Sequence, residues 1–376
     1  MTQSLDRDAL YHPYIHIHDV EWLKATLLCF PQVRRILPGN FIAKDSSVVA
    51  EFKTIKGARG EPLLTDEYAD IYSGESPVHL AQERLLRALY ENEDLVLQKY
   101  AIPEHPQELE WTLFKVHTGK VMYELAQYLC KNRLAVPAPK PGDYFAEELG
   151  DWIGVHRVLA EAIMSFIAIA IARDKGLDIV TSEGNIHHAL AALSEGEVMK
   201  QLVGRPELEK ETPVQEKIDE LAEVVMTFCF NLEKLTPTQI GDLVRDGKDL
   251  RQFKTALVPF AETIPDIANP EERRKRLIQG AALIINEWTK YKKSLPRFAI
   301  DALVDSYEIK FPELAAGVMM GGAGWHLASG AGLAIGLLTW KGLGIWRKFK
   351  ERTSNPYNYL SRIEKKGAAL VVGPSV

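Results

Sequence analysis

The chain has 376 residues, of which 46% are hydrophobic and 26% are charged. This balance is typical of globular proteins and excludes a disordered or fibrous chain, and the length is sufficient for two compact domains and a smaller element. The net charge is −6, whereas a protein that binds a duplex needs a basic face, so nucleic acid is not expected as a main partner.

The three cysteines and the N-terminus both indicate a reducing compartment. Cys29, Cys130 and Cys229 lie far apart in apolar surroundings, which is typical of reduced core residues and not of a disulfide framework. The first ten residues contain no apolar run of the kind found in a secretory signal. We therefore expect a cytoplasmic protein.

The N-terminal region carries the first predicted elements. Residues 11–18, YHPYIHIH, alternate between polar and apolar side chains and predict a β-strand. Asp19 is the predicted N-cap of a helix over residues 21–30, which Pro31 ends. A second strand is predicted over residues 47–55. We therefore expect a small β element in this part of the chain.

From residue 77 onward, apolar residues recur at helical spacing. One stretch, AIMSFIAIAIA at residues 162–172, is apolar on every side, but its length of about 17 Å falls short of the ~30 Å core of a bilayer. We expect it to be a buried central helix. The predicted helices cover residues 77–91, 109–131, 147–173, 216–235 and 271–293, and Thr236-Pro237 begins a further one.

A proline-rich run at residues 136–142, VPAPKPG, predicts a domain boundary, because its three prolines are expected to exclude both helix and ladder pairing. The boundary separates an N-terminal α(+β) subdomain, residues 1–136, from a helical domain, residues 143–312. Residues 313–376 are expected to form an apolar hairpin and a basic tail. The predicted fold class is mainly α: a helical, bundle-like body with a small β element near the N-terminus and a C-terminal glycine-rich helical hairpin.

The glycine-rich stretch at residues 314–340 contains 27 residues without aspartate, glutamate, lysine or arginine, and seven of them are glycine. Glycines spaced four residues apart let helix backbones approach closely. Glycine also weakens a single long helix, and the basic tail favours keeping both ends on one side of a membrane. The stretch therefore predicts a two-arm hairpin, residues 314–325 and 331–346. The residues expected to mediate self-association or membrane contact are Gly317, Gly321, Trp325, Gly332, Gly336, Trp340, Trp346, Arg347 and Lys348.

The first predicted strand carries the histidines that we consider as metal ligands. His12, His16 and His18 have the same parity and on a strand would project from one face. A His-x-His pair is a known half of some metal-dependent hydrolase sites, so His16, His18 and Asp19 are weak metal candidates. We favour instead the polar outer face of an edge strand, because the later chain is predicted to be helical. No catalytic residue is assigned and no cofactor is expected.

Two groups of residues resemble an uncharacterised bacterial family of unknown function. They are Tyr11-x-Pro13-x-Ile15 with Asp19-x-x-Trp22-Leu23-Lys24 and Arg35-Ile36-Leu37-Pro38, and later residues 168–172 with 176–181. The match covers a few dozen residues, and its motifs are structural and not catalytic. The chain departs from the family pattern at Cys29-Phe30 and in its glycine-rich stretch. The resemblance implies a bacterial origin, and such proteins sometimes occur near anti-phage defence genes.

The sequence supports three functional hypotheses. The first is a non-enzymatic bacterial effector or interaction protein, with anti-phage defence implied only by the resemblance. Its C-terminal hairpin would mediate self-association or membrane perturbation, so the partner is another protein or a second copy, with membrane contact through residues 314–346. The second is a cytosolic helical adaptor in which the hairpin is part of the core. The third is a metal-dependent hydrolase that uses the N-terminal histidines.

Overall fold

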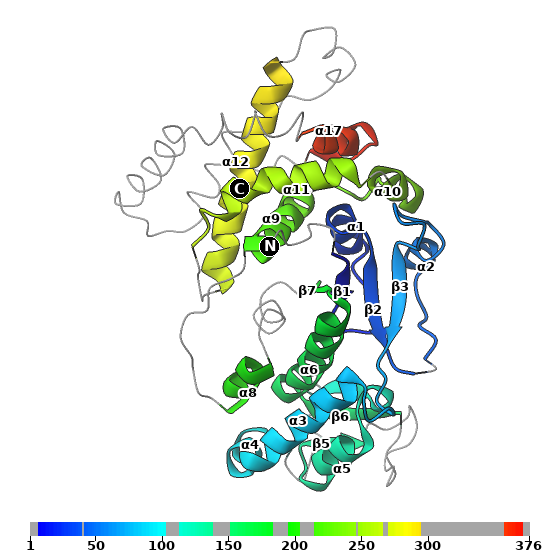
Figure 1. Cartoon of the computed structure of the whole chain (residues 1–376), viewed down its shortest axis with the longest axis vertical. Coiled ribbons are helices and arrows are strands. Elements are labelled where there is room, and N and C mark those ends of the chain that lie inside the picture. Colours follow the sequence, from blue (N-terminus) through cyan, green and yellow to red (C-terminus); the bar gives the residue numbers. More distant parts are fainter. Residues whose placement is uncertain are drawn as a thin grey trace.

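The centre of the protein is a parallel β-sheet with helices on both faces (Figure 1). The structure is a computed structural model. It describes residues 7–39, 41–102, 113–137, 151–182, 195–203, 214–245, 247–265, 270–294 and 357–370.

Four short strands form the parallel sheet. They are β1 (Ala9–Tyr11), β2 (Val33–Leu37), β3 (Leu64–Tyr68) and β7 (Asp178–Val180), in the order β3-β2-β1-β7. Ala9 lies opposite Val33 on one side and Asp178 on the other. Helix α1 (Val20–Cys29) connects β1 to β2, and α2 (Ser47–Phe52) connects β2 to β3. From β1 the chain adds β2 and then β3 on one side of the sheet, and it later adds β7 on the other side of β1. The direction in which strands are added therefore reverses between β1 and β7.

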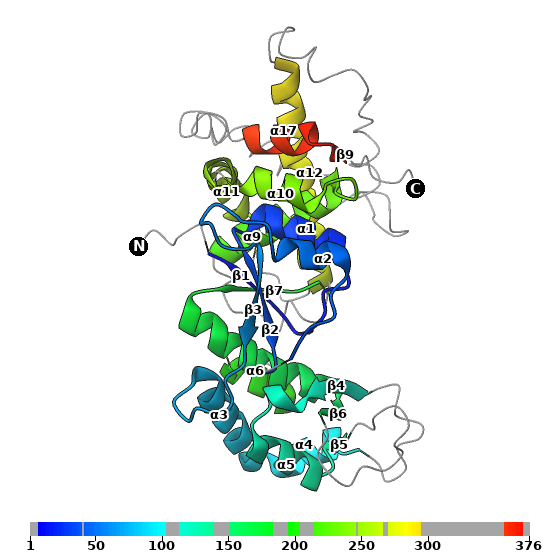
Figure 2. The same ribbon diagram turned by 90° about the vertical axis from the view of Figure 1, so that its right-hand side faces the viewer.

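A second lobe is inserted between β3 and β7. It contains the helices α3 (Pro77–Glu91), α4 (Glu93–Tyr100) and α5 (Tyr123–Lys131), a 3-10 turn η2 (Thr118–Lys120), and the strands β4 (Leu113–His117), β5 (Ala135–Pro137) and β6 (Trp152–His156). The strands form an antiparallel sheet in the order β4-β6-β5. Helix α6 (Arg157–Lys175) then leads back to β7. Figures 1 and 2 show this lobe and α6 on one side of the parallel sheet.

The remaining described helices lie mostly on the opposite side, beyond α1 (Figure 2). They are α9 (Val214–Cys229), α10 (Pro237–Val244), α11 (Lys248–Ala261), α12 (Pro270–Ser294) and α17 (Asn358–Lys365), whereas α8 (Glu195–Val203) packs on α6. Two short strands, β8 (Phe230–Asn231) and β9 (Ala369–Leu370), pair antiparallel beside them.

Each face of the parallel sheet has its own hydrophobic core. Successive side chains of a strand point to opposite faces, so Ala9 and Tyr11 join the core formed with α1 and α9 to α12. Leu10 joins the core formed with α3, α5 and α6. The protein is therefore a layered structure in which helices cover both faces of the parallel sheet.

The predicted mainly α fold is wrong, because the described residues contain a parallel four-stranded sheet and an antiparallel three-stranded sheet and so form an α/β fold. The predicted strand over residues 11–18 ends at Tyr11, and the residues after it form a loop. The predicted strand over residues 47–55 is helix α2, which begins after the cap Ser46. β1 and β7 have three residues each, fewer than the four to eight over which alternation can be recognised.

Several of the predicted helices are confirmed. The helix over residues 77–91 is confirmed as α3, and the one over 271–293 as α12. Residues 162–172 are buried within α6, as expected. Within the described residues, the predicted helices over 109–131 and 147–173 are present only as α5 and α6, because β4 and β6 precede them.

Three further predictions can be compared with the described residues. Helix α9 covers most of the helix predicted over 216–235, but Phe230 begins β8. Pro137 pairs with β6, which corrects the expected absence of pairing, and its strand lies at a sheet edge where proline is tolerated. All three cysteines are free, as expected. The predicted domain limits stay predictions.

Candidate functional site

The loops that follow β1, β2 and β7 meet at the carboxyl edge of the parallel sheet, which is where ligands bind in open α/β sheets. Tyr11, at the end of β1, donates a hydrogen bond from its hydroxyl to the carbonyl oxygen of His16 over 3.3 Å. The same hydroxyl oxygen lies 3.1 Å from Oγ of Ser182, which follows β7. These contacts hold the loop after β1 over the carboxyl end of that strand. The loop therefore lies beside β7, where the direction of strand addition reverses.

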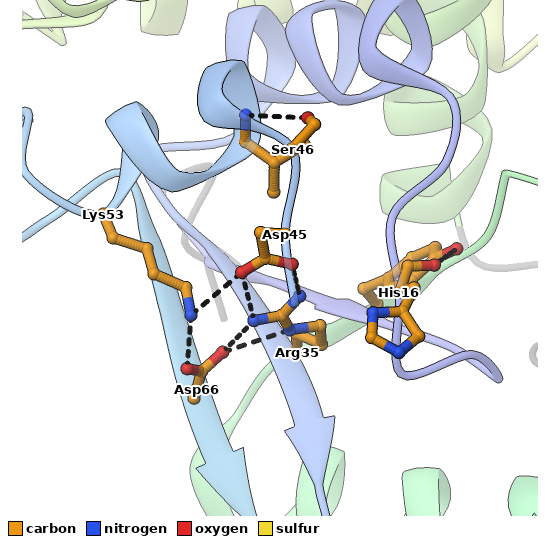
Figure 3. A network of polar contacts seen from close by, with 8 residues as sticks. His16, Arg35, Asp45, Ser46, Lys53 and Asp66 are labelled. Carbon is orange, nitrogen blue, oxygen red and sulfur yellow. Dashed lines mark hydrogen bonds and ion pairs between the residues drawn. The ribbon is translucent and has the colours of Figure 1, made fainter. Parts of the chain in front are cut away.

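A buried ion network lies beside this loop (Figure 3). Arg35 in β2 is completely buried and donates hydrogen bonds to Asp45, at 2.5 and 3.1 Å, and to Asp66, at 2.7 and 3.1 Å. Lys53 bridges the same two carboxylates at 3.2 and 2.7 Å. In Figure 3 Lys53 lies on one side of Arg35 and His16 on the other. Two cations thus face two carboxylates, so the network has no net charge.

The carboxylate of Asp45 is held in its charged form. Burial alone raises the pKa of Asp45, but the hydrogen bonds and charges of Arg35 and Lys53 outweigh burial and lower that pKa below its usual value. Arg35 likewise remains a cation, since its bonds to both carboxylates outweigh its burial and raise its pKa. Arg35 and Asp45 therefore stay ionised near neutral pH.

Lys120, at the end of η2 in the inserted lobe, brings an additional amine to the same region. Its side chain is only 1% exposed. No carboxylate among the described residues forms an ion pair with it, and burial followed by the charge of Arg35 lowers its pKa from 10.5 to about 7. A buried ammonium without a counter-ion is costly, so the amine exists to a large extent in its neutral form at neutral pH.

Backbone contacts fix the position of the turn that carries Lys120. Gln82 of α3 is fully buried, and its amide nitrogen donates to the carbonyl oxygen of Lys120 over 2.9 Å. Its amide oxygen accepts the backbone N–H of Met122 at 2.7 Å. A Cβ atom at Gly119 would lie 3.0 Å from Cβ of Pro38, just after β2. Glycine therefore allows the turn to approach the end of the parallel sheet.

Aromatic rings from the loop after β2 and from the inserted lobe pack together beside His16. His117 of β4 lies 5.2 Å from Phe41 and 4.8 Å from Trp152, measured between ring centroids. Phe41 also lies 6.1 Å from His16. Burial lowers the pKa of His117, and burial followed by the charge of Arg35 lowers that of His16. The charge of Lys120 contributes to lowering both, so the two imidazoles and the amine belong to one electrostatic group.

The structure separates the histidines that the sequence placed on one strand face. His12 is buried, with Nε2 3.4 Å from Oγ of Ser165, whereas His16 is half-buried and His18 is exposed. β1 is a central strand and not an edge strand, which corrects the interpretation that we favoured. Asp19 is confirmed as an N-cap, because its carboxylate accepts the N–H of Trp22 at 2.8 Å.

The predicted metal site gains no support from this arrangement. The rings of His16 and His18 lie 6.0 Å apart between centroids, and Asp19 is used as the helix cap. In the part of the chain that the structure describes, no group of three histidine, cysteine, aspartate or glutamate side chains could hold a metal ion.

The residues expected to mediate self-association or membrane contact lie outside the described residues, as does the whole of 314–346. Their role stays a prediction. Among the helices that are described, none combines the length and the apolar character needed to cross a bilayer. The residues concerned are Gly317, Gly321, Trp325, Gly332, Gly336, Trp340, Trp346, Arg347 and Lys348.

Sequence reasoning missed the residues that build the site. Arg34-Arg35 inside the short apolar segment VRRIL was a usable signal, because a charge in a buried strand needs a partner. Lys120 had no such signal, since a Thr-Gly-Lys turn is common on protein surfaces. Comparison of the chain with protein-family models, curated proteins and solved structures found no match. The site itself must therefore carry the functional inference, and the resemblance of the N-terminal motifs stays a prediction.

Proposed function

We propose that this protein binds an anionic small molecule at the carboxyl edge of its parallel sheet, beside Lys120. The observation that supports the proposal is a buried amine without a carboxylate partner. Nearby, Arg35 and Lys53 already balance Asp45 and Asp66, so a proton on Lys120 adds one uncompensated positive charge.

An anion would remove the cost of that charge. Transfer of an isolated ammonium from water into a protein interior is unfavourable unless an opposite charge accompanies it. A bound carboxylate or phosphate would supply this charge and raise the pKa of Lys120, because a nearby negative charge favours the ammonium form. Binding is therefore expected to be coupled to the uptake of a proton by the protein.

The aromatic rings beside His16 suggest the chemical character of the rest of the ligand. Phe41, His117 and Trp152 pack edge to face against one another, and Phe41 also lies near His16. Binding sites for small molecules commonly combine aromatic surfaces with a few polar groups that orient the ligand. A ligand with one anionic group and one planar, largely apolar part would satisfy both components.

The ligand site is compatible with the effector or interaction role expected from the sequence. In this proposal the α/β body is the part that senses the ligand, and the stretch 314–346 produces the response through self-association or membrane contact. The support for the second half is the composition of that stretch: no charged side chain from 314 to 340, followed by a basic tail. The metal-dependent hydrolase hypothesis is not taken further.

Isothermal titration calorimetry at about pH 8 tests the ligand site, with inorganic phosphate and adenosine diphosphate as probes in two buffers of different ionisation enthalpy. We expect binding with uptake of about one proton, since Lys120 is mostly neutral before binding at this pH. Lys120→Met should abolish the proton uptake and weaken binding. Lys99→Met, at an exposed position on α4, is the matched control and should behave as wild type. Absence of binding, or equal binding by Lys120→Met, would reject the proposal.

A further inference from the structure

We infer that Lys120 is a nucleophilic amine that captures an anionic carbonyl compound, such as a 2-oxo acid or a phosphorylated aldehyde, as a Schiff base. The inference rests on the proposed anion site and deepens it by naming the class of ligand. A Schiff base requires the lone pair of a neutral amine, and lysines acquire it when they are desolvated or placed beside another cation. Lys120 meets both conditions, because it is buried and feels the charge of Arg35.

Comparison with the other buried lysines shows that burial alone does not leave a lysine amine without a partner. Four lysines are buried in the described part of the chain. Lys24 donates to the carbonyl oxygens of residues 232 and 233 at 3.0 and 2.9 Å. Lys217 donates to the carbonyl oxygen of residue 264 at 2.8 Å, and Lys254 pairs with Asp219 at 2.6 Å. Only Lys120 has neither a carboxylate partner nor a hydrogen bond from Nζ among the described residues.

The surroundings of Lys120 supply the other requirements of the reaction. Arg35 directs its N–H groups to Asp45 and Asp66, so it acts on the ligand through its charge and not through direct bonds. The charge of Lys120 contributes to lowering the pKa of His16 and that of His117, so both imidazoles lie within its electrostatic reach. Replacement of the neutral amine by a protonated imine leaves a positive charge beside the anionic group of the ligand.

The chemical step balances without an oxidant or reductant. The lone pair of Nζ attacks the carbonyl carbon, and the electrons of the C=O double bond move to oxygen. Nitrogen loses one proton and this oxygen gains one, with water as the carrier. A second proton, taken from solvent, converts the hydroxyl group into the water that leaves while the C=N bond forms. One amine, one carbonyl and one proton thus give one protonated imine and one water.

Reductive trapping tests the inference. Full-length protein is incubated with glyoxylate or pyridoxal phosphate, reduced with borohydride and mapped by mass spectrometry. We expect Lys120 to be modified at least about tenfold faster than the other buried lysines, Lys24, Lys217 and Lys254, because oxygen atoms hold their ammonium groups and no described oxygen holds that of Lys120. Inorganic phosphate should slow the reaction, and propanal, which carries no charge, should react much more slowly. Lys120→Met should lose this adduct while its circular dichroism spectrum matches that of wild type.

The possible outcomes separate this inference from the proposed function. Binding of phosphate with proton uptake, but no adduct at Lys120, would overturn the nucleophilic role and leave the anion site standing. Absence of both would overturn both. An adduct at Lys120 that forms equally fast with propanal would overturn the assignment of an anionic ligand.

Discussion

Replacement of Lys120 by methionine should make the protein more stable at neutral pH. Methionine has a similar length and no charge, so it removes the cost of a buried amine. Burial and the charge of Arg35 lower the pKa of this amine from 10.5 to about 7. A shift of this size corresponds to roughly 5 kcal/mol, at about 1.4 kcal/mol for each pKa unit. Since the side chain is only 1% exposed, solvent screens this cost little.

The stability difference between Lys120→Met and wild type should depend on pH. Between pH 7 and pH 10.5 the unfolded chain binds a proton that the folded protein does not, so folding is penalised. The penalty is absent above pH 10.5, grows as the pH falls, and is complete below about pH 7. Lys120→Met should therefore exceed wild type by roughly 3 kcal/mol at pH 8 and by roughly 1 kcal/mol at pH 9.5.

Urea unfolding followed by tryptophan fluorescence measures this difference at several pH values, with Lys99→Met as the matched control. The difference in midpoint between Lys120→Met and wild type should shrink as the pH rises. A variant that is less stable than wild type, or a difference that does not change with pH, would refute the reasoning. It would show that Lys120 has a stabilising counter-ion. A more stable protein that has lost anion binding is the pattern expected of a functional residue.

Three further substitutions test how the site is built. Gln82→Leu removes the partners of two backbone groups in the turn of Lys120 and should cost about 2–4 kcal/mol in urea unfolding and weaken phosphate binding in calorimetry. Asp45→Asn leaves Arg35 with one fewer carboxylate and should lower the free energy of unfolding by about 3 kcal/mol. Because the pKa of Asp45 is lowered in the folded protein, wild type should lose this stabilisation only when the pH falls below about 3.8. Gly119→Ala places a methyl group 3.0 Å from the proline after β2 and should cost about 1–3 kcal/mol, read from the urea midpoint. Wild-type stability in any of these variants would contradict the corresponding contact.

Several helices could be predicted because their signals are local. Asp19 caps α1 by accepting the N–H three residues later, and Thr236 forms a capping box with Gln239 at the start of α10. The apolar spacing of residues 77–91 defines α3. Each signal needs only neighbours in sequence, so a single chain is sufficient to recognise it.

The sheet and the site depend on contacts that no local pattern records. β1 and β7 have three residues each, and β2 contains Arg34 and Arg35, so neither an alternating nor a continuous apolar pattern identifies the sheet. The partners of Arg35 come from the loop after β2 and from β3. Lys120 arrives from the inserted lobe, far away in sequence. Only the pairing of distant strands brings these groups together.

The most direct test of the anion site is the pKa of Lys120 itself. Nuclear magnetic resonance of protein labelled with carbon-13 at the lysine ε position measures this pKa, with the resonance assigned by its loss in Lys120→Met. We predict a pKa of about 7 without ligand and an increase of at least about one unit when phosphate saturates the site. A pKa close to 10.5 that phosphate does not change would contradict the account.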